Sequence, residues 1–251
     1  MNVFQAAILG ILQGLAEFLP ISSSGHLVLL SSIFGVQESL FVSIIFHLAT
    51  LFAVVVIFRK DLWRMIKNPF SNEVILLAVA TIMTCIIALI FMPLLKDSFA
   101  GGILPISFLL SAIFLFFSEK RHTKPGKIGI KKAILIGLAQ GVALVPGISR
   151  SGTTISAGLI AGAEKKECAK FSFLLSIPII VASLLLEIVE VAKEGLSVNI
   201  NIVGLVVGGI LAFSIALVSI KFMLKLTEKT NLKWFSLYLV FMSILSGVIF
   251  W

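Results

Sequence analysis

The chain has 251 residues, of which 59% are hydrophobic and only 13% are charged, and its mean hydropathy is +1.15. Soluble domains carry about 25% charged residues, so this composition excludes a soluble globular protein and indicates an integral membrane protein built from helices. The net charge of +8 does not indicate a nucleic-acid partner, and we expect none, because basic residues in membrane proteins mainly report orientation.

The first hydrophobic region, residues 3–36, is not one simple span. Residues 1–37 contain no Lys or Arg, yet EFLPISSSGH at 17–26 places an acid, three hydroxyls and an imidazole close together. The second arm, 26–36, would rise only about 16 Å as a helix, too little for a hydrocarbon core of about 30 Å. We therefore expect a re-entrant hairpin of helix, polar loop and half-helix, which is tolerated where it lines a cavity. The N-terminus lacks the basic region of a signal peptide, so we expect it to be retained in the mature protein.

Six further stretches are apolar and long enough to span a bilayer. They are residues 39–58, 74–95, 98–118, 171–191, 198–220 and 234–251. The fourth is the weakest, since Pro178 interrupts it. A second irregular region, 133–163, is broken by PGISR at 146–150, and its second arm, 153–163, is again too short to cross. The sequence thus predicts six transmembrane helices and two re-entrant hairpins.

Basic residues gather in four connecting segments. With both hairpins re-entrant, these segments all fall on one side, which the positive-inside rule makes cytoplasmic. The protein is then a multi-pass protein of the cell membrane with both termini outside. The segments, which hold 17 of the 20 Lys and Arg residues, are 59–73, 119–132, 164–170 and 221–233.

The two hairpin regions also resemble each other. A shift of 127 residues places residues 6–26 over 133–153 with nine of 21 positions identical. Each half of a single membrane domain (1–251), about 1–127 and 128–251, then holds one hairpin and three spans. Three is an odd number, so the second half is inverted, and the broken helices of such repeats meet near the membrane midplane.

The two loops carry different polar groups. Glu17, Ser23 and His26 have no counterpart in the second loop, which brings Arg150 instead. A guanidinium suits a phosphate group, and both loops lead into half-helices whose N-terminal N–H groups favour an anion. The simpler interpretations are a salt-bridging or snorkelling arginine and serine N-caps. A cap explains one serine, not three together with His26.

Spacing leaves the roles within the first loop open. Glu17 follows Gln13 by four residues on one helix face, and it could act as acid or base or stay charged beside Arg150. His26 could shuttle a proton or attack phosphorus, and Ser23 is the other candidate nucleophile. His47 lies in the middle of a span, where we expect a packing histidine.

Two motifs give the chain a resemblance to a known family. QGLAEFLPISSSGH and PGISRSGTT, the latter followed by FSFLLSIP, resemble motifs of the undecaprenyl-diphosphate phosphatases, the BacA/UppP bacitracin-resistance proteins. The resemblance covers the whole chain in length and hydropathy. It implies hydrolysis of a polyprenyl diphosphate to the monophosphate and inorganic phosphate near the outer face, which recycles the lipid carrier for cell-wall synthesis. It also implies a divalent cation, Mg²⁺ or Ca²⁺, as cofactor.

The family's motif positions can be carried over residue by residue. They imply a catalytic set of Glu17, Ser23, His26 and Arg150. Gln13 and Thr154 also match motif positions. With the serines and glycines at the start of the two half-helices they complete the expected substrate-binding set: Gln13, Ser22, Ser24, Gly25, Ser149, Ser151, Gly152 and Thr154. Many members have glutamate where this chain has Gln13, so a two-carboxylate metal site is in doubt and Glu17 is the only candidate ligand in the hairpins.

Other functions are compatible with parts of the pattern. A transporter or flippase of polyprenyl phosphates is the main alternative, because inverted repeats with broken helices are transporter architecture. Type 2 phosphatidic acid phosphatases share S-G-H and S-R motifs, but they need a second histidine after the arginine, and SGTTISAGLI contains none. The expected partners are the lipid substrate and membrane lipids, and the sequence leaves the oligomeric state, a homodimer included, open.

Overall fold

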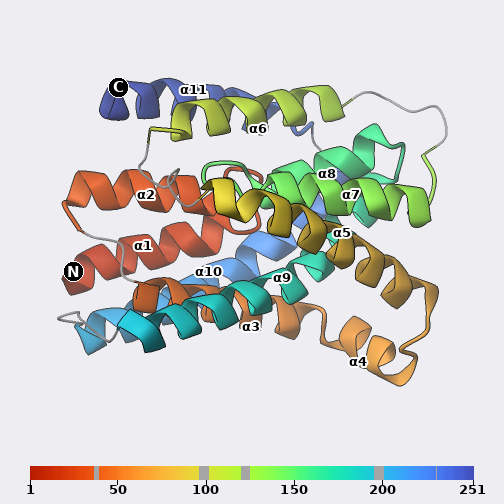
Figure 1. Ribbon diagram of the computed structural model, residues 1–251, viewed down its shortest axis with the longest axis horizontal. Coiled ribbons are helices and arrows are strands. Elements are labelled where there is room, and N and C mark those ends of the chain that lie inside the picture. The colour runs from red at the N-terminus through yellow and green to blue at the C-terminus, as the bar shows by residue number, and fades with distance from the viewer. Residues whose placement is uncertain (37–39, 96–101, 120–124, 195–200, 230) are drawn as a thin grey trace.

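The computed structural model describes residues 1–36, 40–95, 102–119, 125–194, 201–229 and 231–251. Within these ranges the chain forms helices and turns, with a single isolated bridge between Gly126 and Ala163 and no named strand (Figure 1). The helices are α1 (Val3–Ala16), α2 (Ser23–Phe34), α3 (Leu40–Ile57), α4 (Arg59–Lys67), α5 (Asn72–Leu95), α6 (Leu104–Ser118), α7 (Ile130–Val142), α8 (Arg150–Ile160), α9 (Lys165–Glu194), α10 (Ile202–Lys229) and α11 (Lys233–Phe250).

Five of the described helices are long and apolar enough to cross a membrane, namely α3, α5, α9, α10 and α11. They correspond to five of the six predicted spans, so the protein is an all-helical polytopic membrane protein. The remaining predicted span, 98–118, contains α6, which has 15 residues. Residues 98–101 lie outside the described part of the chain, so a sixth full span stays a prediction.

Several elements differ from the sequence-based expectation. Helix α10 runs to Lys229, nine residues past the predicted end at 220, and α2 and α8 each begin three residues before the predicted arms. Helix α9 begins six residues before the predicted span at 171 and runs through Pro178 without a break. A proline removes one backbone hydrogen bond, and packed membrane helices tolerate this loss. The segment after α3, expected as a connection, folds into α4, whose Arg64 pairs with Asp61 at 2.9 Å and with Glu73 at 2.6 Å.

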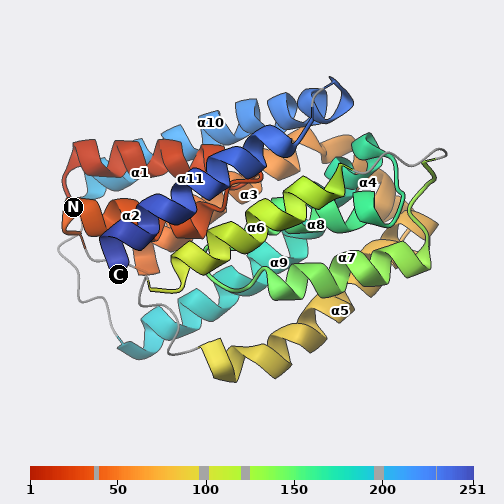
Figure 2. The ribbon, with the colours of Figure 1, turned by 90° about the horizontal axis from the view of Figure 1, so that it is seen from above.

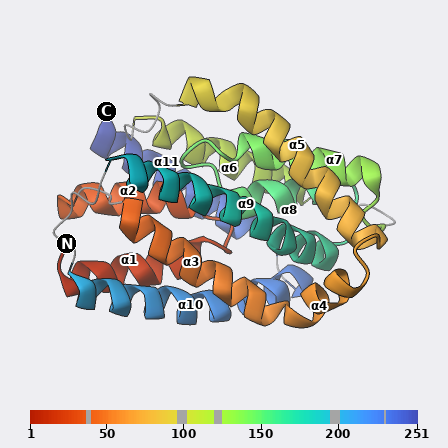
Figure 3. The ribbon, with the colours of Figure 1, turned by 60° about the horizontal axis from the view of Figure 1, so that its bottom comes forward.

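Each hairpin packs its first arm against a helix from the other half of the sequence. Helix α1 lies along α10, and α7 lies along α5 (Figures 2 and 3). Glycines allow both contacts: a Cβ atom on Gly10 would collide with the backbone of Gly208, and one on Gly137 would collide with that of Ala80. Small residues let membrane helices approach this closely. The division into repeat halves at about residue 127 stays a prediction, discussed below.

The two hairpins occupy opposite ends of the molecule. Both termini lie at one end with α1 and α2, whereas α4 marks the other end, where α7 lies (Figure 1). The hairpin loops meet between these ends: Ser24 Oγ accepts from the Gly147 N–H at 3.4 Å, and Ser151 Oγ donates to the Leu19 carbonyl at 3.0 Å. This meeting point holds most of the residues that the sequence singled out.

Candidate functional site

The two half-helices begin with the same N-cap. Ser22 Oγ accepts from the Gly25 N–H at 3.2 Å, and Ser149 Oγ accepts from the Gly152 N–H at 3.1 Å. The N-cap interpretation is therefore confirmed for these two serines, which lie 127 residues apart. Because the first N–H groups of a helix have no intrahelical acceptor, α2 and α8 both present donors at the point where the loops meet.

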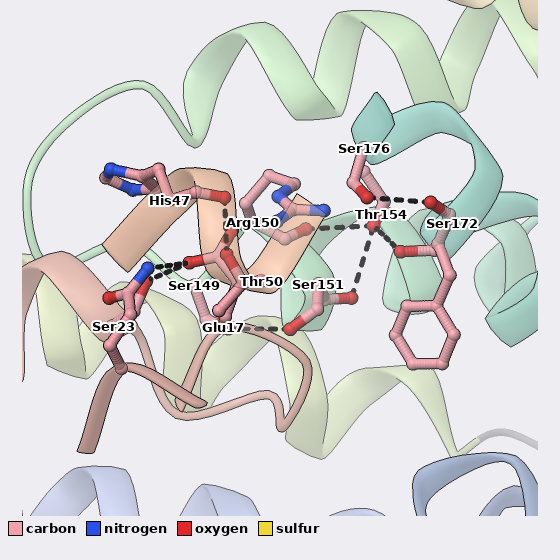
Figure 4. Close-up of polar contacts among 12 residues, drawn as sticks. Glu17, Ser23, His47, Thr50, Ser149, Arg150, Ser151, Thr154, Ser172 and Ser176 are labelled. Atoms are coloured by element: carbon pink, nitrogen blue, oxygen red, sulfur yellow. Dashed lines mark hydrogen bonds and ion pairs between the residues drawn. The ribbon is translucent and has the colours of Figure 1, made fainter. Parts of the chain in front are cut away.

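Between these helix ends lies a buried ion pair. Arg150 Nη2 donates to Glu17 Oε1, while Glu17 Oε2 accepts from Ser23 Oγ at 2.7 Å and from Gln13 Nε2 at 3.2 Å (Figure 4). The Glu17 and Arg150 side chains are only 6% and 14% exposed. The fold thus brings together an acid and a hydroxyl from one loop with the cation of the other.

One donor of this cluster is left without an acceptor. Arg150 Nη1 is buried and has no hydrogen-bond partner within the described ranges. A buried unpaired donor costs roughly 1–3 kcal/mol, and the second nitrogen of a guanidinium fork is suited to a phosphate oxygen. Arg150 can therefore hold Glu17 through Nη2 and an anion through Nη1.

A cavity of about 170 Å³ opens onto this cluster. The loops contribute residues 22–24 and 149–151 together with Glu17, and α9 closes one side with Ile179, Ile180 and Ser183. The lining therefore combines hydroxyls, one carboxylate and one guanidinium with an apolar wall. Such a lining suits the charged head of an amphiphilic molecule.

His26 does not line this cavity. Its Nδ1 lies 2.8 Å from the Ser22 carbonyl and its Nε2 lies 2.6 Å from the Tyr238 hydroxyl. The ring stacks on Tyr238 and meets Phe108 edge-on, with centroids 5.6 and 5.3 Å away. It therefore faces α6 and α11. A catalytic role for His26 stays a prediction, and the observed contacts favour a role in fixing the Ser22 backbone.

Other members of the expected substrate-binding set lie outside the cavity and contact residues of the site. Thr154 Oγ1 donates to the Arg150 carbonyl at 2.8 Å and lies 2.6 Å from Ser172 Oγ, within α8 and α9 (Figure 4). A Cβ atom on Gly25 would lie 2.9 Å from Gly147 Cα, so this glycine permits the loops to touch. Thr154, Gln13 and the two glycines whose N–H groups the serines cap, Gly25 and Gly152, shape the site without lining the cavity.

The cavity is instead lined by His47, which the sequence suggested as a packing residue. His47 comes from α3, and its Nδ1 lies 3.1 Å from the Ser43 carbonyl. The sequence held one signal for it, an ionisable side chain in the middle of a span, which is costly unless it has partners or a task. Which way the side chain turns could not be read from the sequence.

The described residues do not by themselves provide the ligands of a resident metal site. The described part of the chain has no group of three or more His, Cys, Asp or Glu that could hold a metal ion. Both oxygens of Glu17 already accept hydrogen bonds from Arg150, Ser23 and Gln13. Mg²⁺ is usually bound by one or two carboxylates together with waters and substrate phosphates, so this donor set alone does not fit a permanently bound cation.

Comparison with known proteins gives consistent matches along almost the whole chain. A family model described as bacitracin resistance protein BacA matches residues 6–245. The undecaprenyl-diphosphatase of Carboxydothermus hydrogenoformans is 41% identical over 246 residues, which cover 95% of this chain and 94% of that protein. That of Treponema denticola is 38% identical over 268 residues, covering 100% and 98%. Undecaprenyl-diphosphatase 3 of Bacillus cereus is 40% identical over 243 residues, covering 95% and 93%.

Proposed function

The chain belongs to the bacitracin resistance protein BacA family, and from this premise we propose that it hydrolyses undecaprenyl diphosphate to undecaprenyl phosphate and inorganic phosphate. The reaction recycles the lipid carrier of cell-wall synthesis. The observation that carries the proposal is the buried cluster of Glu17, Ser23 and Arg150 where the two loops meet. A phosphoryl-transfer site needs a positioned nucleophile, a proton acceptor and fixed positive charge, and these three residues provide them.

Binding of the diphosphate rests on the second loop and on both helix ends. Arg150 Nη1 and the first N–H groups of α2 and α8 donate to phosphate oxygens, and they stabilise the charge that develops on the transferred phosphoryl group. The prenyl tail stays among the apolar side chains at the lipid-facing surface of the bundle. This division explains why a charged cavity lies inside so apolar a chain.

The first chemical step uses Ser23. Its Oγ already donates to Glu17 Oε2 at 2.7 Å, which is the geometry of a hydroxyl and its general base. Ser23 Oγ forms a bond to the terminal phosphorus, the bond from that phosphorus to the bridging oxygen breaks, and the serine proton passes to Glu17. Undecaprenyl phosphate leaves with the bridging oxygen. Of the two nucleophiles that the sequence left open, Ser23 lines the cavity and His26 does not.

A divalent cation would enter with the substrate. Among the described residues that line the cavity, Glu17 is the only carboxylate, so the diphosphate oxygens and water would supply most ligands. We expect calorimetry to detect Mg²⁺ binding to protein with a diphosphate, but not to protein alone. Tight binding of Mg²⁺ to the free protein would contradict this.

The full topology is also part of the proposal. Six spans and two re-entrant hairpins in two inverted halves explain two observations. The hairpins lie at opposite ends of the bundle, and the first arm of each packs on a helix of the other half, α1 on α10 and α7 on α5. Both termini would lie outside the cell membrane. Lys127 and Lys193 are exposed and can be changed to cysteine one at a time in a Cys85→Ser background. A membrane-impermeant reagent should then label position 127 from inside and position 193 from outside. Labelling of both from one side would contradict the inverted arrangement.

Phosphate release from purified protein tests the function directly. We expect release from undecaprenyl diphosphate and none from undecaprenyl phosphate, with an EDTA arm to show the cation requirement. If no phosphate is released under any divalent cation, while vesicles containing the protein move polyprenyl phosphates between leaflets, the hydrolase proposal is wrong and the transporter alternative replaces it.

A further inference from the structure

The cavity contains an imidazole that the mechanism above does not use. His47 lines it from α3, together with the loop residues. Its Nδ1 lies 3.1 Å from the Ser43 carbonyl oxygen, which can only accept a hydrogen bond. We therefore assign the hydrogen of the neutral ring to Nδ1, which leaves the lone pair on Nε2. The other histidine of the region, His26, has both ring nitrogens engaged by Ser22 and Tyr238.

The carboxylate of Glu187 lies on the Nδ1 side of this imidazole. Ser43 Oγ donates to Glu187 Oε1 at 3.1 Å and lies 3.1 Å from His47 Nδ1, and Glu187 Oε1 itself is 3.9 Å from Nδ1. Glu187 belongs to α9, a candidate span, and its Oε2 is buried with no partner in the described part of the chain. An orienting carboxylate that stabilises an imidazolium is the arrangement of a histidine general base.

The second step needs a base for the attacking water and an acid for the leaving serine oxygen, and two residues can share these tasks. Glu17 takes the proton of Ser23 in the first step and can return it to Ser23 Oγ when the phosphoserine is hydrolysed. While Glu17 holds that proton, another group has to accept the proton of the attacking water. The charged groups that face His47 across the cavity and from α9 are Glu17, Arg150 and Glu187, and Arg150 is always protonated.

We propose that His47 Nε2 is the general base of the second step and that Glu187 is its positioning residue. This inference rests on the proposed function. Water oxygen bonds to phosphorus as the bond from phosphorus to Ser23 Oγ breaks. One water proton passes to His47 Nε2, and Glu17 returns its proton to Ser23. The step regenerates the Ser23 hydroxyl and yields inorganic phosphate and a His47 imidazolium. The imidazolium loses its proton to solvent as phosphate leaves.

Pre-steady-state burst kinetics of His47→Gln, with substrate in excess over protein, test this assignment. The variant should release about one equivalent of undecaprenyl phosphate per protein at nearly the wild-type rate, while inorganic phosphate appears about 10²–10⁴-fold more slowly, the usual contribution of a general base. Acid quenching and mass spectrometry should find phosphate on Ser23. If both products slow equally, or neither slows, His47 is not the base of the second step.

Glu187→Gln gives a second measurement if the histidine variant does not fold. Loss of the partner that orients a metal-bound histidine costs about 10–100-fold, and we expect a slowing of that order in phosphate release alone, with phosphoserine accumulating. A purely structural role would lower the active fraction and slow both products together, which would overturn the positioning role. The matched control is Glu190→Gln, the same change at an exposed position three residues along α9, which should leave both rates unchanged.

The two proposals fail separately. Wild-type protein that releases neither product from undecaprenyl diphosphate would overturn the proposed function itself. Active wild-type protein with an unaffected His47→Gln variant would overturn only the assignment of the second base.

Discussion

The loops of the two hairpins cap their half-helices in the same way but carry different functional side chains. Each begins its half-helix with a serine that caps a glycine N–H three residues on, Ser22 with Gly25 and Ser149 with Gly152. Only the first loop carries the carboxylate and the nucleophilic hydroxyl, and only the second carries the guanidinium. A repeated scaffold thus supplies two facing helix N-termini, and divergence of a few side chains makes them an asymmetric site.

The equivalent glutamines show the same divergence one helix turn earlier. Gln13 Nε2 donates to Glu17 Oε2 at 3.2 Å, whereas Gln140 Nε2 donates to Thr84 Oγ1 on α5 at 3.1 Å. Both side chains are fully buried. The first therefore supports the site and the second supports helix packing, because the second loop has no carboxylate in the place of Glu17.

Glu17→Gln should have the largest effect, because it removes the proton acceptor that only the first loop provides. We expect phosphate release to fall about 10²–10⁴-fold, while a polyprenyl diphosphate still binds through Arg150. Kinetic assays paired with binding measurements check this. The control is Glu164→Gln, the same change at an exposed position. Equal activity of Glu17→Gln and wild type would show that the first loop does not supply the base.

Arg150→Lys tests the contribution of the second loop. A lysine keeps the charge but cannot hold Glu17 and a phosphate oxygen through separate nitrogens of one fork. We expect phosphate release to fall about 10²–10³-fold, comparable with the loss of one oxyanion donor. Arg59→Lys, at an exposed position in α4, should be unaffected. Near-normal turnover of the Arg150 variant would mean that the fork geometry is unimportant.

His26→Ala examines the part of the first loop that faces away from the cavity. The change leaves the Tyr238 hydroxyl and the Ser22 carbonyl without their partner, at a cost of roughly 1–3 kcal/mol in stability. We expect thermal stability and phosphate release to fall together as residues 22–24 shift. Tyr238→Phe keeps the stacked ring and should cost less. Lost activity with unchanged stability would instead support the catalytic role predicted from the sequence.

The smallest expected effect concerns the two N-caps. Ser22 has φ +72° whereas Ser149 has φ −72°, and a positive φ strains a residue other than glycine by roughly 1–3 kcal/mol. Replacing either serine by glycine loses its cap, at a cost of only a few tenths of a kcal/mol, but only Ser22→Gly also relieves strain. We expect Ser22→Gly to be the more stable variant by about 1 kcal/mol in thermal unfolding. Equal stabilities would mean that the first loop is not strained.

The sequence alone determined the membrane class, five long spans and the shortness of the two half-helices, although each half-helix begins three residues before the predicted arm. These are local properties, since they depend on apolar length compared with the thickness of a bilayer and on turn residues within a few positions. The internal repeat and the polar loops also led to Glu17, Ser23 and Arg150, because ionisable groups stand out in an apolar chain.

Only the tertiary structure decided which side chains share the cavity. His26 and His47 are both imidazoles in apolar helices, and one turns to Tyr238 while the other lines the cavity. Their directions depend on the rotation of each helix against neighbours more than 100 residues away in the chain. The partnership of His47 with Glu187, 140 residues later, exists only because α3 packs on α9, a contact that no local pattern in either helix encodes.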